Sequence, residues 1–143
     1  MKKLVIFFFL FSNLVFSQNI TVLTPNGSER VDSCVDTNIT WDSSNTSQYY
    51  NIYYSVNGGT DWVSIATSYN TIENNFEWNV PNTSSVNCLV KITDSNDESI
   101  FDISDQFFII DGALILLYPS GNENFIAGNE IDLIYSYNQD QVS

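Results

Sequence analysis

The chain has 143 residues, with 17 acidic residues, four basic residues, no histidine and a formal net charge of −13. This length fits one domain of ordinary size and part of another. Binding to nucleic acid and to anionic membrane surfaces depends on lysine and arginine, so the composition argues against both as partners.

Residues 1–17 have the organisation of a secretory signal peptide. A basic start, Met1-Lys2-Lys3, precedes an apolar run over residues 4–16. We expect cleavage after Ser17. The mature chain is then secreted or held at the cell surface and does not span a membrane. An uncleaved membrane anchor is the alternative, which the shortness of the apolar run disfavours.

Removal of the signal makes the chain more acidic. Lys2 and Lys3 leave with it, so Arg30 and Lys91 remain against 17 acids and the net charge becomes −15. A solvated, self-repelling surface explains this acidity, and binding of a divalent cation is the alternative.

Two cysteines, Cys34 and Cys88, are predicted to form a disulfide, because a secreted chain meets an oxidising compartment. Two buried thiols are the alternative. A metal pair is disfavoured, because the chain has neither a histidine nor a third cysteine.

Seven short strands are predicted in the first unit, each bounded by turn signals, and no amphipathic helix of useful length accompanies them. Their ranges are 20–24, 37–41, 49–56, 62–66, 74–80, 87–93 and 105–111. The strongest hairpin signal is Asn57-Gly58-Gly59, because glycine supplies a positive φ without steric cost. The pattern predicts an all-β fold, an immunoglobulin-like or fibronectin III-like β-sandwich over residues 18–111.

A shift of 94 residues aligns the start of this unit with the end of the chain. The segment Leu23-Thr-Pro-Asn-Gly-Ser-Glu29 falls on Leu117-Tyr-Pro-Ser-Gly-Asn-Glu123, and Trp41 falls on Tyr135. Residues 112–143 are therefore predicted to begin a second, incomplete copy. About 30 residues cannot bury a sandwich core, so we expect a fragment of a longer tandem-repeat protein or a truncated product. The alternative is that residues 113–143 add strands to the first domain.

Six segments of the first unit, taken in order, resemble a known repeat. They are Pro25-Asn-Gly-Ser-Glu29, Asn38-Ile-Thr-Trp41, residues 52–62, Phe76-Glu-Trp-Asn-Val-Pro81, residues 87–94 and Ser104-Asp-Gln-Phe107. Together they resemble a secreted bacterial β-sandwich repeat grouped with the Ser-Thr-rich glycosyl-phosphatidyl-inositol-anchored membrane family. That family is similar to the N-terminal domain of yeast cell-wall glucan-synthesis proteins. The resemblance covers about residues 20–110 and again 114–135. It implies an extracellular, non-catalytic module of a larger protein and supplies no catalytic residue.

Two positions depart from the family pattern. The family usually has an aromatic residue where Val31 stands and often a glycine where Cys34 stands, and the second copy has Phe125 and Gly128 there. This departure makes the predicted disulfide a local addition.

The predicted hairpin also resembles the Asp-box of sialidase-type propellers, with Asn57 in the Asp position. The matching residues are Ser55, Asn57, Gly59 and Trp62, and Gly58 lies between them. In those proteins the motif is structural. We expect the same here, because polar side chains at a turn bond its backbone and a tryptophan packs across strands; ligand contact is the alternative.

Acidic and aromatic residues give two site predictions. Calcium prefers carboxylate and amide oxygens, and Asp94, Asn96, Asp97 and Glu98 lie close together in sequence. Solvated acids and Asx-turns explain the same set, and no other cofactor is predicted. Carbohydrate contact is predicted for exposed aromatic residues of one sheet face, with Tyr49, Tyr53, Trp62 and Tyr69 as the candidates.

The sequence thus predicts a non-catalytic spacer, adhesion or interaction module whose partners are other extracellular protein domains or polysaccharide. The first alternative is a carbohydrate-binding module. The second is an accessory domain of a larger secreted enzyme whose catalytic part lies elsewhere. Catalysis within the chain is disfavoured, because nucleophilic serine or cysteine needs a base that histidine usually provides.

Overall fold

The computed structural model describes residues 17–137, so the predicted signal peptide lies outside the described residues apart from Ser17. Within this range the chain is all-β, as predicted, with eleven strands and no helix. The strands are β1 (Asn19–Thr24), β2 (Arg30–Asp32), β3 (Asp36–Ser44), β4 (Tyr49–Ser55), β5 (Val63–Asn70), β6 (Asn75–Asn79), β7 (Ser85–Asp94), β8 (Phe101–Ile103), β9 (Phe108–Asp111), β10 (Leu114–Tyr118) and β11 (Ile134–Tyr137). No helix long and apolar enough to cross a membrane occurs in residues 17–137.

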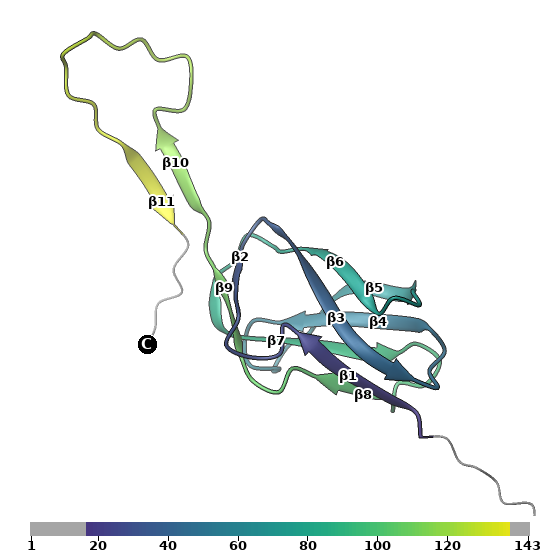
Figure 1. Cartoon of the computed structure of the whole chain (residues 1–143). Coiled ribbons are helices and arrows are strands. Elements are labelled where there is room, and N and C mark those ends of the chain that lie inside the picture. Colours follow the sequence, from purple (N-terminus) through teal and green to yellow (C-terminus); the bar gives the residue numbers. More distant parts are fainter. Residues whose placement is uncertain (1–16, 138–143) are drawn as a thin grey trace, which may run out of the picture.

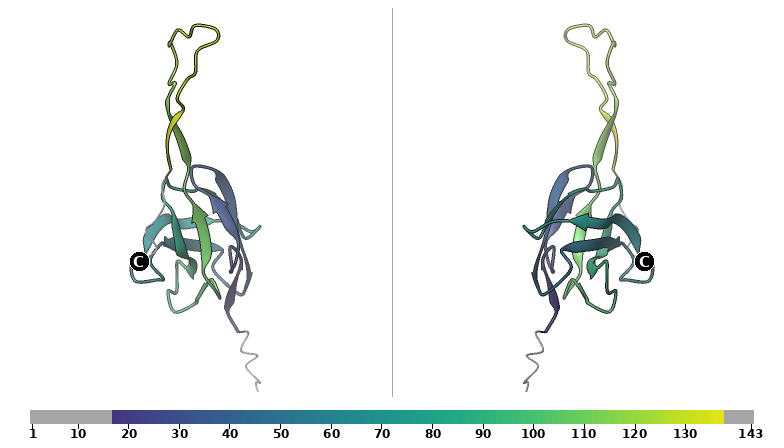
Figure 2. Two further views of the ribbon diagram at one scale, coloured as in Figure 1. Left: turned by 90° about the vertical axis from the view of Figure 1, so that its left-hand side faces the viewer. Right: turned by 90° about the vertical axis from the view of Figure 1, so that its right-hand side faces the viewer.

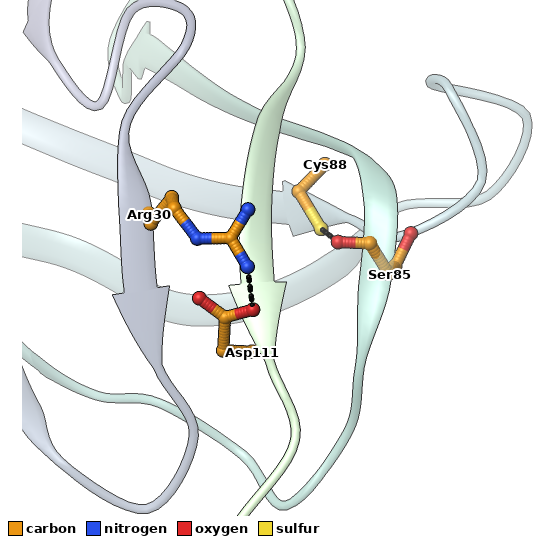
Figure 3. A network of polar contacts seen from close by, with 4 residues as sticks. All are labelled: Arg30, Ser85, Cys88 and Asp111. Atoms are coloured by element: carbon orange, nitrogen blue, oxygen red, sulfur yellow. Dashed lines mark hydrogen bonds and ion pairs between the residues drawn. The ribbon is translucent and has the colours of Figure 1, made fainter. Parts of the chain in front are cut away.

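The first nine strands build two sheets that share one core (Figure 1). The smaller sheet has the order β1-β3-β6, and the larger has the order β2-β9-β7-β4-β5, with β8 paired to β7. All pairs are antiparallel except β2 with β9, which run parallel. Arg30 on β2 and Asp111 on β9 form an ion pair across the parallel pair (Figure 3).

The core consists of alternate side chains from the facing strands of both sheets. Ile39 and Trp41 on β3 face Tyr50 and Ile52 on β4, and all four are at most 1% exposed. The rings of Trp41 and Tyr50 meet edge to face with centroids 5.0 Å apart, which joins the two sheets directly. The period-2 pattern of the sequence therefore does place one side of each strand in a common interior.

The predicted strands differ from the observed ones most at β2, β5 and β8, and the other strand ends differ by up to three residues. The strands β2 and β8 were not predicted, because each has only three residues, which is shorter than the runs of four or more residues that indicate a strand. The strand predicted at 62–66 starts instead at Val63 and continues to Asn70. The connection before it spans residues 56–62, two residues longer than the predicted connection of residues 57–61.

The strands β10 and β11 form a two-stranded sheet of their own and pair with no strand of the sandwich among the described residues. Figure 2 shows this hairpin projecting from the end of the sandwich. The alternative in which residues 113–143 add strands to the first domain is therefore wrong for residues 114–137.

The hairpin repeats the geometry of β1 and β3 at the 94-residue shift. In the first pair Val22 lies opposite Trp41 and Thr24 opposite Thr40, with a register shift between the two positions. The equivalent residues of β10 and β11 repeat both pairings and the same shift, as Leu116 with Tyr135 and Tyr118 with Ile134. The two hairpins therefore point their side chains alike.

The connecting segments repeat as well. The Glu29 carboxylate accepts the N–H groups of Asn26 and Gly27, and the Glu123 carboxylate accepts those of Ser120 and Gly121. The peptide bonds before Pro25 and Pro119 are both cis. Cys34 has a φ of 61°, and Gly128 at the equivalent position has a φ of 93°, a region that glycine enters without strain.

The two copies give a matched test of burial. We expect Ile39→Ala to lower the free energy of unfolding by about 2–5 kcal/mol, because it removes a fully buried side chain. The equivalent change Leu133→Ala should alter it by less than about 0.5 kcal/mol, because that side chain is 65% exposed. Urea denaturation of both variants measures the difference, and equal losses would contradict this assignment of burial.

Candidate binding site

The outer face of the larger sheet carries a lysine between two aromatic rings. Tyr53 on β4 lies directly opposite Lys91 on β7. The Lys91 Nζ lies 4.8 Å from the ring centroid of Tyr53 and 4.8 Å from that of Trp62. Both distances are within the range of a cation–π contact. Lys91 thus links the strand residue Tyr53 to Trp62, which ends the loop before β5.

A groove opens beside this cluster. Its volume is about 280 Å³, and it is lined by Tyr53, Lys91, Thr93, Glu98, Phe101 and Ile103. This volume is at the lower limit for small-molecule sites, so the groove fits one sugar ring or one side chain better than an extended chain. The groove offers apolar walls, one ammonium group and one carboxylate.

Sequence reasoning identified only Tyr53 and Glu98 among the residues that line this groove. Phe101 and Ile103 were missed because they lie on β8, which was not predicted. The signal that would have found them is the short alternation Phe101-Asp102-Ile103 directly after the acidic turn. Lys91 was missed as a site residue because the sequence does not show that β7 pairs with β4, which brings Lys91 opposite Tyr53.

The four aromatic residues predicted to contact carbohydrate do not form one strip. Tyr53 and Trp62 are brought together by Lys91. Tyr49 is 45% exposed at the start of β4 and does not line the groove. Tyr69 packs edge to face on Phe76, with centroids 5.1 Å apart, and is partly buried against the core.

The loop after β4 is held by bonds to its own backbone. The Ser55 hydroxyl accepts the N–H groups of Asn57 and Gly59, at 3.3 and 2.9 Å, and donates to the Asn57 side-chain oxygen. The same Asn57 oxygen accepts the N–H of Asp61. A Cβ at Gly59 would lie 3.4 Å from the Trp62 ring, and Gly59 has a φ of 85°. A larger residue would therefore crowd the Trp62 ring and strain its own backbone. These contacts give Ser55, Asn57 and Gly59 a structural role, while the Trp62 ring faces Lys91.

Two of the acidic residues predicted as calcium ligands, Asp94 and Asp97, bind separate sets of protein groups. The Asp94 carboxylate accepts the Ser47 hydroxyl at 2.6 Å, the Ser47 N–H at 2.7 Å and the Asn96 N–H at 2.8 Å. The Asp97 carboxylate accepts the N–H and hydroxyl of Ser99. Across residues 17–137 the structure contains no group of three or more histidine, cysteine or acidic side chains placed to hold a metal ion.

Burial and hydrogen bonding act in opposite directions on Asp94, which is 2% exposed. Burial on its own raises the pKa of the Asp94 carboxyl. The hydrogen bonds from Ser47 and from backbone N–H groups of the following turn outweigh it, so the pKa lies below its usual value. The charged Asp94 carboxylate therefore fastens the start of β4 to the turn after β7.

The predicted disulfide between Cys34 and Cys88 is not formed in the described structure. Cys34 is exposed in the turn between β2 and β3, whereas Cys88 is fully buried on β7, where its thiol lies 3.5 Å from the carbonyl oxygen of Ser85 (Figure 3). The strand β9 lies between β2 and β7 in the sheet. Cys34 lies two residues past the end of β2, where its N–H bonds the carbonyl oxygen of Val80.

Comparison of the chain with family models, with curated proteins and with solved structures finds no match.

Asp94 predicts a pH dependence of stability. Its pKa is lower in the folded chain than in the unfolded chain, so its contribution is present above the unfolded value of about 3.9 and is lost as the pH falls through the folded value. We expect Asp94→Asn to lower the free energy of unfolding at pH 7 by about 1–3 kcal/mol and to flatten the loss of stability between about pH 5 and pH 2. Urea denaturation at a series of pH values measures both effects.

The matched control is Asp97→Asn, because Asp97 is exposed and bonds only within its own turn. It should change the free energy of unfolding by less than about 0.5 kcal/mol. An Asp94→Asn chain with the original pH profile would contradict the role assigned to this carboxylate.

Proposed function

We propose that the chain is a secreted or cell-surface β-sandwich repeat protein that acts as a non-catalytic spacer or interaction module. Its partners are other extracellular protein domains or polysaccharide. The observation that supports this most directly is the repetition of one hairpin, with its register shift and its glutamate-bonded turn, at a 94-residue interval. The basic and apolar start of the sequence supports secretion.

The path of the chain suits an array of units placed end to end. In Figures 1 and 2, β1 begins at one end of the sandwich and β10 leaves from the opposite end. Only two residues, Gly112 and Ala113, separate β9 from β10. A short connection of this kind passes directly from one unit to the next, so each added unit lengthens the molecule. Length gained in this way is what a spacer requires.

The fold within each unit is proposed to be immunoglobulin-like or fibronectin III-like, and the chain to be a member of the bacterial repeat family that it resembles. The two facing sheets with a shared core support the first part. The repeated segment Pro-x-Gly-x-Glu, at residues 25–29 and 119–123, supports the second.

The spacer proposal predicts an elongated shape in solution. Small-angle X-ray scattering of residues 18–143 should give a maximum dimension at least about 15 Å greater than that of residues 18–112, because the five residues of β10 extend by about 3.3 Å each. Equal maximum dimensions would mean that the hairpin folds back on the sandwich, and would contradict the proposal.

A second candidate function, a carbohydrate-binding module, is favoured by the groove beside Tyr53 and Lys91. A sugar ring stacked on Tyr53 would also meet Lys91 and Glu98, which offer a donor and an acceptor. The spacer and carbohydrate-binding functions are compatible. The groove lies on the outer side of the larger sheet, whereas the repeated hairpin lies beyond the end of the sandwich.

This candidate predicts saccharide binding that depends on Tyr53. Binding of residues 18–143 to a glycan array should fall at least about tenfold in Tyr53→Ala, the loss expected when a stacking contact worth about 1.4 kcal/mol is removed. The control Tyr49→Ala removes an exposed tyrosine outside the groove and should bind as before. The carbohydrate candidate fails if the folded chain binds no glycan or if both variants bind equally.

A further inference from the structure

The β10–β11 hairpin exposes the apolar face that its counterpart buries. Four inward positions of β1 and β3 are at most 3% exposed, and the equivalent positions of the second hairpin are at least 53% exposed. The pairs are Ile20 with Leu114, Val22 with Leu116, Ile39 with Leu133 and Trp41 with Tyr135. All four exposed residues are leucine or tyrosine, so the second face has kept its apolar character.

This face has a defined shape, because the register fixes which side chains share it. Leu116 lies opposite Tyr135, as Val22 lies opposite Trp41. The register shift that follows in both hairpins turns the next residues in the same direction. The surface that Leu114, Leu116 and Tyr135 form, with Leu133 directly before β11, therefore has the arrangement of one whose partner is visible in the same molecule.

In the first unit that partner is the segment of residues 45–111. Tyr50 places its ring against Trp41. The Asp102 carboxylate accepts the N–H of Val22 at 2.8 Å, and the Ser104 hydroxyl donates to the carbonyl of Pro25 at 2.8 Å. The cover thus supplies an aromatic ring, a carboxylate and a hydroxyl, each at a defined place on the hairpin.

We propose that the inner face of the β10–β11 hairpin is a docking surface for a polypeptide with the chemistry of residues 45–111. The occupant is an antiparallel sheet that places an aromatic ring on Tyr135, a carboxylate on the N–H of Leu116 and a hydroxyl on the carbonyl of Pro119. It completes a second sandwich. This inference rests on the proposed repeat architecture and names the partner of its second unit.

A second copy of this chain fits the face less well. Its residues 45–111 already cover its own β1 and β3. Suppose that the second hairpin of one molecule displaced β1 and β3 of another from this cover. The four buried side chains of β1 and β3 would then become exposed in place of the four equivalent side chains of the second hairpin. The exchange leaves the exposed apolar area about the same, so it has no hydrophobic driving force.

The test supplies the partner in a known form. A chain of residues 18–137 is continued directly by a second copy of residues 44–111, because Tyr137 is equivalent to Ser43 and the register then continues unbroken. Hydrogen–deuterium exchange of the Leu114–Tyr118 amides is compared with that of the natural chain. We expect exchange to be at least about 100-fold slower in the extended chain, because a docked hairpin opens only with its sandwich.

Two neighbouring substitutions show whether the inner face carries the effect. Leu116→Asp, on the inner face, should abolish the protection in the extended chain. Leu117→Asp should preserve it, because the equivalent Leu23 is 45% exposed in the complete unit. Loss of protection in both variants, or in neither, would overturn the proposal.

Three further outcomes would also overturn the proposal. The first is rapid exchange in the extended chain while β7 of the first unit remains protected. The second is protection only after Leu114, Leu116, Leu133 and Tyr135 are replaced by the first unit's Ile, Val, Ile and Trp, because the natural face would then not fit this partner. The third is protection in the natural chain that accompanies dimerisation in sedimentation equilibrium, which would make a second copy the occupant. The scattering result on elongation is independent of the first two outcomes, and sedimentation equilibrium identifies the third, so the two proposals fail separately.

Discussion

The structure depends on the covering of one apolar hairpin face. In the first unit, the inner side chains of β1 and β3 are buried because β4, β7 and β9 lie across them, and the Trp41–Tyr50 ring contact joins the two layers. Two carboxylates add bonds between segments of the same sandwich. The Asp94 carboxylate fastens the start of β4 to the turn after β7, and the Asp102 carboxylate bonds the backbone of β1. A hairpin alone is only marginally stable in water, so its cover determines whether the unit becomes a stable sandwich.

The second hairpin shows the same local structure without that cover. Its strand pairing, register shift, cis peptide bond and glutamate-bonded turn all repeat those of the first. The local geometry is therefore encoded in the hairpin's own sequence, by the Pro-x-Gly-x-Glu segment and the alternating apolar residues. Burial is not encoded there, because it requires residues equivalent to 45–111. This separation is why an acidic chain carries a row of exposed leucines on its second hairpin.

Prediction from sequence succeeded where the signal was local and failed where it was not. Alternation located seven strands and the all-β class, because period 2 is a property of neighbouring residues. It missed β2 and β8, which exist only because β9 and β7 offer free edges. The Cys34–Cys88 pairing failed because composition does not reveal that Cys34 lies in an exposed turn whereas Cys88 is buried on β7. The groove at Tyr53 was predicted only in part, because the order of the strands brings Lys91, Phe101 and Ile103 to it. Tyr69 packs inward on Phe76, on a strand that was predicted to end at Ala66.

The second hairpin is a structural copy of the first. Cross-strand nuclear Overhauser contacts in residues 18–143 test this copy. We expect backbone contacts of Leu116 with Tyr135 and of Tyr118 with Ile134, matching those of Val22 with Trp41 and Thr24 with Thr40. A regular ladder that places Tyr118 opposite Leu133, or the absence of cross-strand contacts at these positions, would contradict it.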